Sequence, residues 1–133
     1  DALDPTLQSA QRIALNNGYD SFLMFNVYAQ RATRPDDMER VCNSALHEEN
    51  RKAFRYLLSL SETPAIWAAW GNIIEKRDYL MDCMRDFAAD GQAANAQWFT
   101  AGPLLKSGHP HHPLYLKSTA ALQPFDIDAY LCR

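Results

Sequence analysis

The chain has 133 residues, 47% of them hydrophobic, which suits one folded domain with a substantial core. The formal net charge of −3 argues against a protein that coats DNA non-specifically, because such domains are strongly basic. The three cysteines are odd in number and widely spaced, and no apolar run approaches the roughly 18 residues that span a bilayer, so we expect a reduced, cytoplasmic protein with no membrane partner.

The predicted elements alternate between helix and strand. Asp4 and Pro5 form a helix start, and apolar residues follow at helical spacing until Gly18. Residues 21–28 (SFLMFNVY) are mostly apolar and of strand length, which is typical of a buried parallel strand. A loop follows, and a helix is then predicted over residues 47–60.

The second half of the chain continues the alternation. Residues 64–70 (PAIWAAW) are predicted as a buried strand, and Gly71 turns this strand directly into a helix that runs to about Ala89. A third strand is predicted over residues 96–100 and a short terminal helix over residues 125–131. This order predicts an α/β fold, with a three-layer α/β/α sandwich around a mainly parallel sheet.

Polar segments leave the carboxyl ends of the three predicted strands, at residues 26–33, 70–72 and 106–115. Ligands of open α/β sheets bind beyond these ends, so the three segments should share one rim. The last of them contains the histidine loop, which we define as residues 108–116 (GHPHHPLYL). The topology therefore predicts that this loop lies at a binding or active site.

Each candidate residue before the histidine loop has two interpretations. The amide of Asn26 either faces a ligand such as the edge of a nucleobase or bonds to neighbouring backbone. Arg31 either binds a phosphate or carboxylate or is a solvated loop charge. After Trp70, Gly71 either opens a helix whose N–H groups bind an anion or simply permits the turn.

The histidine loop itself allows three interpretations, based on His109, His111 and His112. Their spacing does not match known zinc ligand sets, so no metal is expected. A histidine here is better suited to donating a hydrogen bond to developing negative charge or to moving a proton. An exposed, histidine-rich turn is the alternative. The common nucleotide-binding fingerprints are missing from the sequence, and no cofactor is expected.

Several motifs together resemble the family catalogued as domain of unknown function 1643, small bacterial and phage proteins. These motifs are DPT at residues 4–6, N-x-x-A-x-R-A-T at residues 26–33, AAWG at residues 68–71 and the histidine loop. They follow the family order over almost the whole chain. The resemblance implies a strand and an N-P-S-T-A loop ahead of DPT, so we expect residues 1–133 to form a single α/β domain that lacks this upstream strand.

A more distant resemblance is to the uracil-DNA glycosylases. FLMFN at residues 22–26, AAWG at residues 68–71 and HPHHPL at residues 109–114 are similar to that superfamily's strand, strand–helix and loop motifs, in the same order. The resemblance implies a glycosylase-like fold. It also implies two catalytic residues: Asn26 would read a base, and His109 would stabilise the departing base.

The remaining candidate residues are assigned to ligand binding. They are Arg31, Thr33, Trp70, Gly71, His111, His112 and Tyr115. The expected partner is a small nucleobase or nucleotide-like ligand. Nucleic acid is a further candidate, although the acidic charge fits it poorly.

Three functions stay open at this point, and no oligomeric state is predicted. One is glycosylase-like hydrolysis of an N-glycosidic bond. The second is a non-catalytic module that binds a nucleotide or modified base. The third is a purely structural or partner-binding domain.

Overall fold

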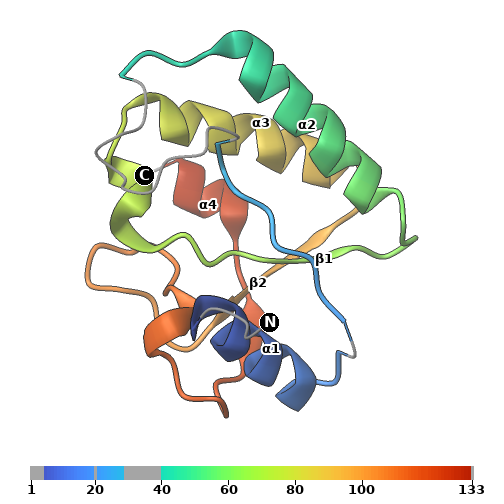
Figure 1. Cartoon of the computed structure of the whole chain (residues 1–133), viewed down its shortest axis with the longest axis vertical. Coiled ribbons are helices and arrows are strands. Elements are labelled where there is room, and N and C mark those ends of the chain that lie inside the picture. The colour runs from blue at the N-terminus through green and yellow to red at the C-terminus, as the bar shows by residue number, and fades with distance from the viewer. Residues whose placement is uncertain (1–4, 20, 29–39, 133) are drawn as a thin grey trace.

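The computed structural model describes residues 5–19, 21–28 and 40–132, which form a mixed α/β structure (Figure 1). The α-helices within these residues are α1 (Pro5–Asn16), α2 (Ser44–Leu58), α3 (Tyr79–Ala93) and α4 (Ile127–Leu131). Two short 3-10 helices are η2 (Gly71–Glu75) and η3 (Pro113–Tyr115). The strands are β1 (Ala65–Trp67), β2 (Gln97–Ala101) and β3 (Leu122–Pro124). In this part of the chain no helix combines the length and apolar character that crossing a membrane requires.

The three strands form one mixed sheet with β2 in the centre. β1 pairs with β2 in parallel, as the helix–strand alternation predicts, and β3 pairs with β2 in antiparallel fashion. The pattern did not predict β3, because it has three residues and ends in Pro124, which suits an edge strand. The α/β class is thus confirmed, whereas these strands do not confirm a three-layer sandwich with a mainly parallel sheet.

The main core lies where α2 and α3 pack side by side (Figure 1). The rings of Phe54 on α2 and Phe87 on α3 meet edge to face with centroids 5.0 Å apart, and Phe25 packs against both. Arg51 also joins the two helices by a two-pronged ion pair with the buried Asp90, at 2.8 and 3.0 Å. Aromatic packing and this ion pair fix one wall of the structure.

Residues 21–28 do not form the predicted strand. They run as an extended segment that passes in front of β1 in Figure 1, without regular pairing to it. The side-chain amide of Asn50 donates to the carbonyl oxygens of Asn26 and Val27, at 3.0 and 3.5 Å. A side chain on α2 therefore occupies positions that a neighbouring strand would need, and Leu23 and Met24 remain exposed.

The prediction of a single helix from Gly71 to about Ala89 is also wrong, because this part of the chain forms two separate helices. Gly71 has a positive φ of 62° and opens η2, and α3 begins at Tyr79. Between them the guanidinium of Arg77 donates to the carbonyl oxygen of Lys76 at 2.9 Å. Arg77 thereby takes an acceptor that a continuous helix would offer to a backbone N–H group.

Candidate functional site

A large cavity lies between α1, residues 21–28, α2 and the sheet. Its volume of about 1390 Å³ exceeds the roughly 300–1000 Å³ of typical small-molecule sites, so a ligand of that size would fill part of it. The wall is mainly apolar and aromatic, and none of the described residues that line it is Asp, Glu, Lys or Arg. Burying an unpaired charge is costly, so this lining favours a neutral ligand.

Three residues singled out from the sequence line this cavity together: Asn26, Trp70 and His112. Asn26 comes from the extended segment, where its side chain is exposed rather than buried in the core. Trp70 follows β1, and His112 lies at the start of η3. The fold thus brings an amide, an indole and an imidazole from three distant segments to the lining of one cavity.

Gly71 positions His112 at the cavity wall. The Gly71 N–H donates to the carbonyl oxygen of Pro110 at 2.9 Å, which joins the turn after β1 to the histidine loop. A Cβ atom at Gly71 would lie 3.6 Å from the Cβ of His112, so the two residues are in van der Waals contact range. The positive φ of Gly71 is a conformation that glycine adopts readily, which explains its place in this turn.

His112 is a neutral hydrogen-bond donor in this setting. Burial lowers the pKa of His112 from its ordinary value of 6.5, and the neighbouring His111 acts in the same direction. Its Nδ1 accepts a hydrogen bond from the Leu114 N–H at 3.2 Å, so the proton of the neutral ring lies on Nε2. The ring can therefore offer one N–H group to a ligand.

His109 has a different environment, because protein groups engage both of its ring nitrogens. Nδ1 lies 2.6 Å from the Tyr130 hydroxyl and Nε2 lies 2.7 Å from a Glu75 carboxylate oxygen. The carboxylate accepts from Nε2, and the Tyr130 hydroxyl also accepts from the Trp70 Nε1–H at 3.0 Å. His109 is 4% exposed. This arrangement ties the histidine loop to η2 and α4.

The described histidine-loop residues in the cavity wall are His112 and Pro113, while His109 reaches the wall indirectly, through Tyr130 and Trp70. His111 is half-buried, and its Nδ1 donates to the carbonyl oxygen of His112 at 2.8 Å.

Three further residues were predicted to bind the ligand, and the structure says little about them. Tyr115 is the last residue of η3. Arg31 and Thr33 lie outside the described residues.

The sequence reasoning missed both partners of His109, Glu75 and Tyr130. Glu75 follows Gly71 by four residues and was predicted to lie in an ordinary helix. Tyr130 lies in the predicted terminal helix, and only the structure shows that it is buried there. Neither residue belongs to a motif with the histidine loop, so the pairing required the fold.

The described residues contain no group of three or more His, Cys, Asp or Glu side chains that could hold a metal ion. The histidines of the loop point to separate partners instead, as their hydrogen bonds show. The described residues around the cavity offer hydrogen-bonding groups and aromatic rings.

Comparison with known proteins identifies the family of the chain. Residues 1–114 match the family model described as a protein of unknown function (DUF1643), a stretch that includes DPT and most of the histidine loop. No curated protein and no solved structure gives a significant match. Because the family model covers most of the chain, the protein belongs to the DUF1643 family.

Proposed function

We propose that the cavity lined by Asn26, Trp70 and His112 binds a nucleobase or a nucleotide-like small ligand without catalysing its conversion. The observation that carries this proposal is the presence of these three side chains in the lining of one cavity, which holds no described charged residue. A nucleobase is flat and neutral and carries hydrogen-bonding groups on its edge. It matches a cavity with aromatic walls and a few polar groups.

The polar groups have complementary hydrogen-bonding roles in this proposal. The amide of Asn26 offers one acceptor and two N–H donors, which can pair with the donor–acceptor edge of a base. The Nε2–H of His112 offers a further donor. Trp70 supplies a ring face, and its N–H is held by Tyr130, which fixes the orientation of the indole.

Binding is favoured over hydrolysis by the environment of His109. Its two ring nitrogens already have partners in Glu75 and Tyr130, so they are occupied in the structure. The described wall also lacks a carboxylate that could activate water. These features suit a binding site better than an active site.

Glycosylase-like hydrolysis of an N-glycosidic bond is the second candidate, and the presence of both Asn26 and His112 in the cavity lining favours it. In this reading His112, rather than His109, would stabilise the departing base. The candidate includes the three-layer, uracil-glycosylase-like arrangement that the resemblance implies. Its support is that α2 and α3 lie above the strands and α1 below them in Figure 1.

The test is a calorimetric titration of the full chain with free bases, nucleosides and mononucleotides. Loss of one neutral hydrogen bond is worth about 0.5–1.5 kcal/mol, so Asn26→Ala and His112→Ala should each weaken binding roughly 2- to 13-fold. Gln92→Ala removes an exposed amide on α3 outside the cavity lining, and as the matched control it should bind like the wild type. Binding that none of these variants changes would contradict the proposed site.

A chromatographic product assay on the same ligands separates the two candidates. The binding proposal expects no free base to be released, even at an enzyme concentration equal to that of the ligand. Release of base from a nucleoside or from uracil-containing DNA, abolished by His112→Ala, would establish the second candidate instead.

A further inference from the structure

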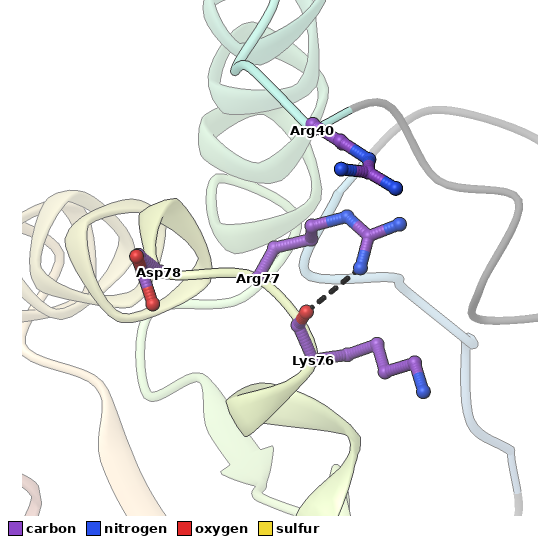
Figure 2. A pocket seen from close by; sticks show the side chains of 4 residues that line it. All are labelled: Arg40, Lys76, Arg77 and Asp78. Carbon is purple, nitrogen blue, oxygen red and sulfur yellow. Dashed lines mark hydrogen bonds between the residues drawn. The ribbon is translucent and has the colours of Figure 1, made fainter.

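A second, smaller hollow lies at the turn between η2 and α3. Its volume is about 450 Å³, and among the described residues it is lined by Arg40, Lys76, Arg77 and Asp78. Figure 2 shows the guanidinium groups of Arg40 and Arg77 on the same side of the turn, with the Lys76 chain extending beside them. The carboxylate of Asp78 points to the other side. Three positive side chains thus gather at one place on a chain whose net charge is −3.

These cations suit a phosphate group in both charge and geometry. Guanidinium groups present planar sets of N–H donors that match phosphate oxygens, whereas a lysine supplies a point charge. Arg77 is half-buried, and its bond to the Lys76 carbonyl holds the guanidinium in place. Arg40 and Lys76 are exposed, so their ends can reach an incoming anion.

Tyr28 links the hollow to the cavity. It lines the cavity, and its ring packs on that of Tyr79 with centroids 5.0 Å apart. Its hydroxyl accepts the Asn43 N–H at 2.7 Å, three residues beyond Arg40. Burial is the main cause that raises the pKa of Tyr79, while the charge of Arg77 acts in the opposite direction. The positive charge therefore lies beside the tyrosine pair at the end of the extended segment.

We propose that Arg40, Lys76 and Arg77 bind the phosphate group of a nucleotide whose base occupies the adjacent cavity. This inference rests on the proposed function, and it selects a nucleotide over a nucleoside or a free base. The neutral cavity and the basic hollow then have separate roles: the first takes the flat, uncharged base, and the second takes the charged end of the same molecule. A small mononucleotide is the expected source of the phosphate, rather than the backbone of a nucleic acid.

The experiment compares three probes by calorimetry: adenosine and uridine, their 5′-monophosphates, and inorganic phosphate. In the wild type the better-bound monophosphate should bind roughly 10-fold more tightly than its nucleoside, because hydrogen bonds to charged groups are the stronger class. The double variant Arg40→Ala/Arg77→Ala should lose this preference. Arg85→Ala removes an exposed arginine from α3 and is the matched control, which should keep it. Raising the salt concentration should weaken binding of the monophosphate more than binding of the nucleoside.

A single substitution at the exposed Lys76, Lys76→Gln, provides a second variant if the double variant is unstable. It should reduce the preference for the monophosphate by a smaller factor. Equal wild-type affinities for nucleoside and monophosphate would overturn the inference and leave the proposed function standing. Phosphate binding that depends on Arg40 and Arg77, with no nucleoside binding, would support the anion site and overturn the base cavity. Tight binding of a single-stranded oligonucleotide with no binding of mononucleotides would overturn the choice of a small ligand.

Discussion

Replacing His109 by alanine should destabilise the protein, because the imidazole joins the histidine loop to two other segments. The ring is 4% exposed and contacts Glu75 and Tyr130 through its two nitrogens. The Glu75 side chain is 62% exposed, so water can replace this partner at little cost. Tyr130 keeps its bond from Trp70 but loses its partner at Nδ1. One lost hydrogen bond and a partly collapsed cavity together give a loss of about 2–3 kcal/mol.

The expected loss can be measured by urea unfolding and by the melting temperature. With an unfolding entropy of about 2.1 cal/mol/K per residue, 2–3 kcal/mol corresponds to a drop of roughly 7–11 °C for a chain of this size. His111→Ala is the control, because its ring is half-buried and bonds to an adjacent carbonyl; it should fall within about 2 °C of the wild type. If His109→Ala melts with the control, His109 does not support the fold, and a direct role in ligand chemistry becomes the better explanation.

Four further outcomes follow from local features of the structure. The pKa of His112 in the folded protein lies below 6.5, so the unfolded state binds more protons than the folded state. The free energy of unfolding should therefore fall as the pH drops from about 6.5 towards that pKa. His112→Gln should flatten this part of a plot of the urea midpoint against pH. Gly102 has a φ of 70°, and a Cβ there would lie 2.6 Å from a leucine methyl carbon that can rotate away, so Gly102→Ala should lower the free energy of unfolding by about 1–3 kcal/mol. Gly71→Ala shares the positive φ without the clash and should cost about 1–2 kcal/mol in the same assay. Burial is the main cause of the raised pKa of Cys83, which is about 12. At pH 8 a thiol reagent should therefore label the exposed Cys132 rapidly and Cys83 only when the protein unfolds. Rapid labelling of both cysteines in the folded state would refute the buried position of Cys83.

Elements with local signals could be predicted from the sequence. The Asp-Pro start and the Gly18 stop predicted α1, which the structure places at Pro5–Asn16. The Asn43 side chain caps α2 by accepting from the N–H groups of Ala45 and Leu46, so this helix begins three residues before the predicted start. The predicted strand at residues 96–100 is confirmed as β2, shifted by one residue. Caps and apolar runs act over a few residues, so a sequence pattern can carry them.

Features that depend on distant partners could not be predicted. An apolar run forms a strand when another strand makes backbone hydrogen bonds to it. In residues 21–28, a backbone carbonyl group accepts a hydrogen bond from the side-chain amide of Asn50 instead. The turn at Gly71 depends on Pro110, which lies 39 positions later. For the site, Asn26 and His112 both line the cavity although the strand expected to carry Asn26 does not form, and the partners of His109 depend on packing between distant segments.

The hydrogen-bonded chain from Glu75 through His109 to Tyr130 should constrain how related sequences diverge. Three separate segments contribute to it, so no single replacement preserves the pattern of donors and acceptors. In an alignment of homologues, these positions should therefore change together: a relative with phenylalanine at position 130 should lack histidine at position 109, while position 111 should vary independently of both.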